Sequence, residues 1–206
     1  MAGGTDVASC GMLLCRANRG IRKSTAAMKN YLSKMKGGAK SPSGVDLTEI
    51  LWSWVGSAIG IGICGYLSSK YFEPRDVTFI IGSFGASAVL VYGAIKSPLS
   101  QPRNVIGGHI VSGLVGVASF HFVGGAPWVA AALGVSLAIV AMLATKTLHP
   151  PGGATALIAV VGGQKVHELG ILYAFIPAGL GASILVVVAV LINNLSKKRR
   201  YPEYWL

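Results

Sequence analysis

The stretch from His149 to Thr155 joins an imidazole, two prolines, two glycines and a hydroxyl, and is the most distinctive part of the sequence. Two prolines cannot continue a helix and force the residue before them to be extended, but proline suits the first turn of a new helix. We therefore expect a helix to start near Gly152. Its free N–H groups would carry about half a positive charge and attract an anion. The residues expected to bind the anion there are His149, Pro150, Pro151, Gly152, Gly153, Ala154 and Thr155.

A second break lies in the apolar stretch of residues 79–95, where Gly82 and Gly85 interrupt it. A half helix from Gly85 to Ile95 would present a second N-terminus. Unsatisfied N–H groups in lipid cost several kcal/mol each, and a bound anion would satisfy them. The residues expected to bind it from this side are Ser83, Gly85, Ala86 and Ser87. The alternative is that both breaks are kinks held by neighbouring helices.

Three histidines lie in or beside the apolar stretches: His109, His121 and His149. An ionisable residue in a membrane span indicates function by default, and a histidine can carry a coupled proton near neutral pH. The alternative is a neutral ring bonded to a backbone carbonyl. We favour function for His149 and His109, and expect His121 at the interface. The three could form a metal cluster only if the fold brought them together, so no metal site is expected.

Polar and basic residues follow the second and fourth apolar stretches. Residues 97–104 form a tight polar loop that contains Arg103. Arg103 is either a topology anchor or a residue that attracts anions to a mouth, and Lys146 has the same two interpretations. The expected gating or mouth residues are Lys96, Arg103, Asn104, His109 and Lys146.

The composition indicates that membrane helices position these residues. The chain has 206 residues, of which 52% are hydrophobic and 12% charged, against about 25% charged in an ordinary soluble domain. Its mean hydropathy is +0.61. Three cysteines cannot make a disulfide framework and lack zinc-type spacing. The net charge of +11 is concentrated at the two ends, around an apolar middle. This pattern favours contact with a lipid bilayer over nucleic-acid binding.

Six apolar stretches cover residues 51–68, 79–95, 105–123, 127–145, 153–162 and 170–192. A spanning helix needs about 20 apolar residues, which the first, third, fourth and sixth stretches provide. The second is interrupted, and the fifth is long enough for roughly half a bilayer. Six crossings would place 15 basic residues on one side and 3 on the other. The sequence therefore predicts six crossings with both termini on the inner side of the membrane.

An internal repeat divides these segments into two units. Residues 54–60 resemble 128–134, residues 85–90 resemble 153–158, and residues 112–116 resemble 178–182, in the same order. Because three crossings is an odd number, the second unit would be inverted, as in many transporters. The expected fold class is all-α: a polytopic membrane protein with six membrane segments in two inverted three-segment repeats. Two short broken half-helices would meet near the midplane.

The two ends of the chain differ from its middle. Residues 1–46 are a basic flexible tail or targeting segment, for which an interfacial helix, an organellar transit peptide and a disordered tail stay open. Residues 47–195 form the expected transmembrane domain, and residues 196–206 a basic C-terminal tail. The small-residue face Gly56, Gly60 and Gly62 would permit close helix packing, so a homo-oligomer is compatible with the sequence.

Three blocks resemble the HPP family of integral membrane proteins: residues 147–157, 83–90 and 97–109. The likeness covers roughly residues 48–195. Plant and cyanobacterial members are associated with nitrite transport across the chloroplast envelope or the plasma membrane. The resemblance therefore implies nitrite or a similar small anion as substrate, and a chloroplast inner envelope or plasma-membrane location. The family is usually described with four spanning segments, two fewer than the six expected above.

Taken together, these patterns favour a transporter or channel for a small monovalent anion with no cofactor, and the resemblance implies that the anion is most specifically nitrite. Residues 77–165 contain no Asp or Glu, which argues against cation transport. We expect no enzymatic activity and no catalytic residues. The alternative is a membrane-embedded enzyme, or a structural or signalling membrane component without transport activity. An enzyme would need the histidines to converge, whereas a transporter would place the two breaks across a polar cavity.

Overall fold

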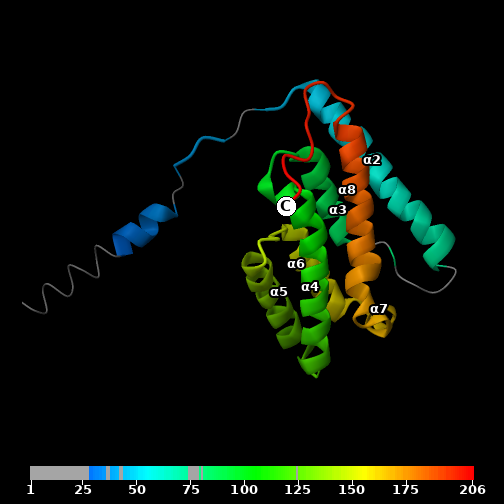
Figure 1. The fold of residues 1–206 in the computed structure, drawn as a ribbon. Helices are drawn as coiled ribbons and strands as arrows, with labels where there is room; N and C mark the ends of the chain where they lie inside the picture. The colour runs from blue at the N-terminus through cyan, green and yellow to red at the C-terminus, as the bar shows by residue number, and fades with distance from the viewer. Residues whose placement is uncertain (1–27, 36–37, 42–43, 74–78, 80, 124) are drawn as a thin grey trace, which may run out of the picture. The chain divides into compact units, whose positions relative to one another are not determined.

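The computed structural model describes residues 28–35, 38–41, 44–73, 79, 81–123 and 125–206 (Figure 1). The chain divides into two units, Met1–Gly44 and Val45–Leu206. In the first unit, residues 28–34 form a short helix. Met28, Tyr31, Leu32 and Met35, which the sequence places on one helical face, are all exposed. Residues 1–27, 36–37 and 42–43 of the proposed tail or targeting segment lie outside the described residues.

All regular secondary structure in the described part of the second unit is helical. In chain order it contains α2 (Leu47–Leu67), η1 (Ser68–Phe72), α3 (Ser83–Ala88), η3 (Val89–Gly93), η4 (Pro98–Ser100), α4 (Pro102–Val123), α5 (Pro127–Ala144), α6 (Pro150–Val161), α7 (Gln164–Leu169), η5 (Ala174–Gly179) and α8 (Leu180–Asn193). Four helices are long and apolar enough to cross a membrane: Leu47–Phe72, Pro102–Val123, Pro127–Ala144 and Ala174–Asn193. Two shorter apolar helices, Ser83–Gly93 and Pro150–Val161, lie where the sequence predicts broken segments. The all-α class is thus confirmed with four candidate spans, and the six crossings and the inverted repeat stay predictions.

Both short helices start two residues earlier than the sequence suggests. The α6 helix begins at Pro150 rather than Gly152, because its two prolines fill a first turn that needs no N–H donor. His149 before it is extended (φ −140°, ψ 108°), as expected for a residue that precedes proline. The other short helix begins at Ser83 rather than Gly85. Its last turn ends at Gly93, two residues before the expected Ile95.

Helix α4 is the central element, against which α5, α6 and η5 pack (Figure 1). Its glycines allow backbones to approach closely. A Cβ atom on Gly116 would lie 2.5 Å from the carbonyl oxygen of Ala156 and 2.8 Å from its Cα. On Gly113 it would lie 2.8 Å from the Cα of Ala174. Both obstacles are backbone atoms, so neither can turn aside for a side chain.

We expect Gly116→Val to lower the free energy of unfolding by about 1–3 kcal/mol, the usual cost of overpacking a close contact. The valine would push α6 away from α4. Thermal unfolding of the purified protein in detergent measures the effect. Gly62→Val is the matched control, since a Cβ atom at Gly62 meets nothing within 4 Å. Equal melting temperatures for the two variants would contradict the close α4–α6 packing.

The glycine face of α2 is occupied within the chain. A Cβ atom on Gly56 would lie 2.6 Å from Cδ1 of Tyr92, and Gly60 faces the Tyr92 hydroxyl. That hydroxyl donates to the carbonyl of Leu185 (3.1 Å), so Tyr92 links α2, η3 and α8. Of the three glycines considered for packing between copies, only Gly62 faces open space. The homo-oligomer stays a prediction.

The C-terminal tail packs against one end of the helices through Arg199, whose side chain is 1% exposed. All five of its N–H groups are used. They donate to the Glu49 side chain (3.1 Å) and carbonyl (2.6 Å), the Ser53 hydroxyl (2.8 Å), the Tyr92 carbonyl (3.2 Å) and the Asn193 amide oxygen (2.9 Å). Arg199 therefore joins the start of α2 to the ends of η3 and α8.

Further contacts join the C-terminal tail to the start of α2 and to the loop before α4. We name this end of the unit the loop end. Lys198 pairs with Asp46 (2.9 Å), the residue that caps α2. This ammonium and the backbone N–H of Glu49 hold the pKa of Asp46 below its usual value. Tyr201 donates to the carbonyl of Ser100 (2.7 Å). The loop end thus comprises the start of α2, residues 94–101 and the C-terminal tail.

Candidate functional site

The two short helices meet side by side, with their first turns overlapping. The hydroxyl of Ser83 lies 2.9 Å from that of Thr155, and the hydroxyl of Ser87 lies 2.9 Å from Nε2 of His149. Because the earlier residue of one helix faces the later residue of the other, α3 and α6 run in opposite directions. The half-helices therefore lie alongside each other in opposite directions, and their position near the midplane of a membrane stays a prediction.

The meeting region brackets the middle of α4. A Cβ atom on Gly108 would lie 2.6 Å from Cβ of His149, while Gly116 faces Ala156. At 1.5 Å per residue, these two positions lie about 9 Å and 21 Å along a helix of about 33 Å. The site is therefore held between the central helix and both short helices.

Five side chains form one buried hydrogen-bonded cluster in this region, which we name the histidine–hydroxyl cluster. Its members are fully buried: Ser83, Ser87, His109, His149 and Thr155. The Ser87 hydroxyl lies 2.7 Å from Nε2 of His109 and 2.9 Å from Nε2 of His149. Nδ1 of His109 lies 2.7 Å from the Thr155 hydroxyl. The cluster thus bridges α3, α4 and the start of α6.

A backbone carbonyl determines which ring nitrogen of each histidine carries the hydrogen when both rings are neutral. Nδ1 of His149 lies 2.7 Å from the carbonyl of Leu99, which can only accept, so this nitrogen carries a hydrogen. In a neutral ring Nε2 must then accept from Ser87. The single hydrogen of Ser87 is thereby used, so His109 donates from Nε2 to Ser87 and accepts at Nδ1 from Thr155, which requires the Thr155 hydroxyl to turn away from Ser83 and Ser83 to donate in its place. These tautomers are assigned from the hydrogen-bond pattern.

The same heavy-atom positions also accommodate one additional proton. When the Thr155 hydroxyl turns to donate to Ser83 (2.9 Å) or to the Pro151 carbonyl (3.3 Å), Nδ1 of His109 can donate to it. Ser87 then donates to His109, and a doubly protonated His149 donates to both Ser87 and Leu99. The bonds of Ser87 to both rings and of Thr155 to His109 are kept with their directions reversed, and the bond from His149 to Leu99 is unchanged. The cluster is therefore a wire that can pass a proton between Thr155 and His149.

The helix ends offer fewer free donors than the sequence suggests. Pro150 and Pro151 have no N–H group, and the N–H of Gly152 donates to the carbonyl of His149 (2.8 Å). Gly85 and Ala86 are exposed on the side of α3 away from the cluster, and Pro150 is exposed. Gly153 and Ala154 are half-buried. The structure therefore gathers the polar side chains of the predicted site and leaves several backbone positions outside it.

The expected mouth residues are divided among three roles. Arg103 donates to the carbonyl of Thr145 (3.0 Å), and Asn104 to that of Leu148 (2.9 Å). Both therefore hold the segment that leads into α6. Lys96 is exposed at the loop end, and Lys146 is exposed in the loop after α5, where it has a positive φ of 57°. His109 belongs to the cluster instead of a mouth.

Sequence reasoning missed two residues of the site. Tyr173 is buried and donates to the carbonyl of Thr155 (3.0 Å). Ser112 is fully buried, and its hydroxyl faces Gly152. In the described part of the chain, this hydroxyl is the one buried side-chain nitrogen or oxygen atom without a hydrogen-bond partner. Ser112 follows His109 by three residues, so helical periodicity places both on one face and could have found it.

The third histidine of the sequence analysis does not join the cluster. His121 is exposed and lies twelve residues after His109 on α4, about 18 Å away along the axis. Within the described residues, no group of three or more His, Cys, Asp or Glu side chains could hold a metal ion. His109 and His149 do converge, with ring centroids 5.2 Å apart.

Comparison with known proteins identifies the family. The family profile described as the HPP transmembrane region matches residues 42–202. A transmembrane protein of Dictyostelium discoideum is 47% identical over 178 residues, which cover 85% of this chain and 57% of that protein. A second one is 39% identical over 197 residues, or 91% of this chain and 69% of that protein. No solved structure matches. The chain belongs to the HPP family of integral membrane proteins.

Proposed function

We propose that this protein moves a small monovalent anion across the membrane, with nitrite as the first candidate, by way of the histidine–hydroxyl cluster. The observation that carries the proposal is the full burial of five uncharged polar side chains where two broken helices meet. Buried polar groups inside a membrane domain are costly and mark substrate or proton pathways. Residues 77–165 contain no carboxylate that would repel an anion.

The proton wire gives the anion a counter-charge. An isolated ion is expensive to bury, whereas an anion beside a protonated imidazole forms a neutral pair. The cluster accepts one proton without losing a bond, which matches the single charge of nitrite. Ser112 supplies an unused hydroxyl next to Gly152 for a ligand or a water molecule. We infer that anion and proton enter the cluster together.

The test is anion flux into proteoliposomes that contain the purified full chain. Nitrite is compared with nitrate, chloride and formate at two pH values. We expect nitrite flux to increase at the lower pH and to be lost in His149→Ala. His121→Ala is the matched control and should retain the flux, because His121 lies outside the cluster. If folded protein carried none of these anions, the transport proposal would be overturned.

One arrangement favours a second candidate, a membrane-embedded enzyme. The Ser87 hydroxyl donates to His149, and Leu99 orients the ring from its other side, which is the pattern of a serine nucleophile with a histidine base. A fluorophosphonate probe would label Ser87 in such an enzyme and would not label Ser87→Ala. Labelling without flux would favour the enzyme. The absence of both labelling and flux would favour a structural or signalling component.

Six crossings in two inverted repeats remain our proposed topology. In chain order, α2, α3 and α4 are a long, a short and a long helix. The helices α5, α6 and α8 repeat this order of lengths. The start of α2, the loop before α4 and the C-terminal tail share the loop end, so an even number of crossings separates each from the next. Basic residues are abundant at this end, which supports a cytoplasmic or stromal orientation. We propose the chloroplast inner envelope or the plasma membrane as the location.

A further inference from the structure

We propose that the outer face of α2 and η3 holds one anionic phospholipid, with its phosphate at the loop end and an acyl chain along α2. This site lies apart from the histidine–hydroxyl cluster and does not depend on the transport proposal. It is built from an apolar groove and a basic pocket that adjoin each other.

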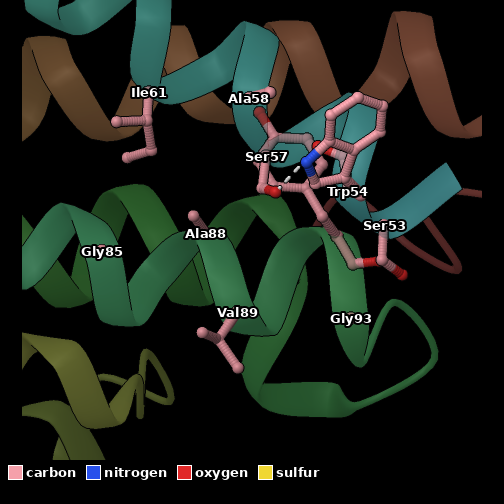
Figure 2. Close-up of a pocket in the computed structure, with 10 residues that line it drawn as sticks. Ser53, Trp54, Ser57, Ala58, Ile61, Gly85, Ala88, Val89 and Gly93 are labelled. Atoms are coloured by element: carbon pink, nitrogen blue, oxygen red, sulfur yellow. Dashed lines mark hydrogen bonds between the residues drawn. The ribbon is translucent and has the colours of Figure 1, made fainter. Parts of the chain in front are cut away.

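The apolar groove lies between α2 and the α3–η3 helix and has a volume of about 560 Å³. Figure 2 shows Trp54, Ala58 and Ile61 of α2 opposite Ala88 and Val89. The Trp54 side chain is exposed, as suits an aromatic residue near a membrane interface. Gly85 and Gly93 have no side chains to fill this space, so the groove is open to an acyl chain.

The basic pocket lies at the loop end and has a volume of about 350 Å³. Lys96, Lys198 and Arg199 line it, together with a single acid, Glu49. Lys96 is exposed, and within the described part of the chain its ammonium forms no hydrogen bond or ion pair. Lys198 pairs with Asp46 on the surface, where both side chains are at least half exposed. Such a surface ion pair is weak, so a phosphate can replace Asp46 as the partner of the Lys198 ammonium.

The two hollows form one continuous site. Gly93 lines both of them. Ser53 lines the groove and Glu49 lines the pocket one helical turn away, and Arg199 bonds to both residues. From Glu49 to Ile61 the site follows α2 for about 18 Å. It is basic at the membrane surface and apolar below it, which is the chemical pattern of an anionic phospholipid.

The charge pattern selects this occupant over a second copy of the chain. A two-fold contact brings the same patch of each subunit to the interface, so two basic pockets would face the shared axis. Basic pockets between helices at the cytoplasmic surface are suited to anionic headgroups. The phosphate would be bound by Lys96 and Lys198, because the N–H groups of Arg199 are already used.

Thermal unfolding of the full chain in detergent micelles tests this site. The probes are micelles that contain phosphatidylglycerol or phosphatidylcholine, and inorganic phosphate alone. A ligand of the folded state raises the melting temperature. We expect phosphatidylglycerol to raise it by several degrees more than phosphatidylcholine, and phosphate alone to leave it unchanged. The preference should disappear in the double variant Lys96→Gln, Lys198→Gln and persist in Lys197→Gln, Arg200→Gln, whose residues do not line the pocket.

The groove is tested separately by filling it. Gly85→Leu places a side chain in the groove, where a Cβ atom meets nothing within 4 Å, and should remove the phosphatidylglycerol effect. Gly62→Leu, also in open space but outside the groove, should retain it. Equal stabilisation by both lipids, an equal effect of phosphate alone, or a preference that survives the lysine variant would overturn the proposal. A change of oligomeric state in Gly85→Leu with an unchanged lipid effect would assign this face to a second copy.

Discussion

Arg199→Ala is expected to lower the free energy of unfolding by about 3 kcal/mol, the low end for breaking a buried ion pair. The low end applies because the Glu49 side chain is 31% exposed and can be partly hydrated. The buried carbonyl of Tyr92 and the buried amide of Asn193 would each lose a donor. Arg199→Lys should recover only part of the loss, since an ammonium cannot reach the same acceptors as a planar guanidinium.

Arg200→Ala is the matched control for this prediction. Arg200 is the next residue and carries the same charge, but it is exposed. Thermal and denaturant unfolding in detergent would measure all three variants. If Arg200→Ala and Arg199→Ala were equally stable, Arg199 would act only through its charge, as a topology signal does.

Ser87→Ala is expected to reduce anion flux to the background of protein-free liposomes. Ser87 is the single hydroxyl that joins the two histidines, so its loss interrupts the wire. It also leaves two buried ring nitrogens without their partner, which costs about 1–3 kcal/mol for each such group. We therefore expect a lower melting temperature as well as a loss of flux.

Two further variants distinguish the loss of proton transfer through Ser87 from the loss of folding stability. Ser87→Thr keeps the hydroxyl and should retain flux with its pH dependence. Ser183→Ala removes a hydroxyl that donates to the carbonyl of Gly179 (2.8 Å), one turn earlier in the chain, and should change neither property. A folded Ser87→Ala variant with normal, pH-dependent flux would show that protons do not pass through Ser87.

Local rules of helix formation account for what the sequence predicts well. The prolines at 150 and 151 and the glycines around Ser83 act on their own backbone, so the two broken segments could be located to within two residues. The four long apolar helices follow from length and hydropathy in the same way. Crossing number and repeat symmetry depend on how segments pack, and a sequence pattern does not determine packing.

Partners distant in sequence explain what the sequence could not predict. His109 and His149 were recognised as functional candidates, but Ser87 joins them across 22 and 62 residues. The carbonyl of Leu99 is a backbone group, so the residue type at this position does not reveal its role. It nevertheless determines the tautomers of both histidines when their rings are neutral. In the sequence, Arg199 is one of four consecutive basic residues and nothing distinguishes it from the others. It alone is buried among them, because α8 packs against α2.

The loop that contains Leu99 is itself held by the C-terminus. Tyr201 donates to Ser100, the N–H of Glu203 donates to the Gln101 side chain, and Tyr204 donates to the carbonyl of Pro98. The last residues of the chain therefore support the carbonyl that decides which nitrogen of His149 bears the proton. Displacement of residues 201–204 would therefore remove the support of the carbonyl that orients His149, without any contact to the cluster itself.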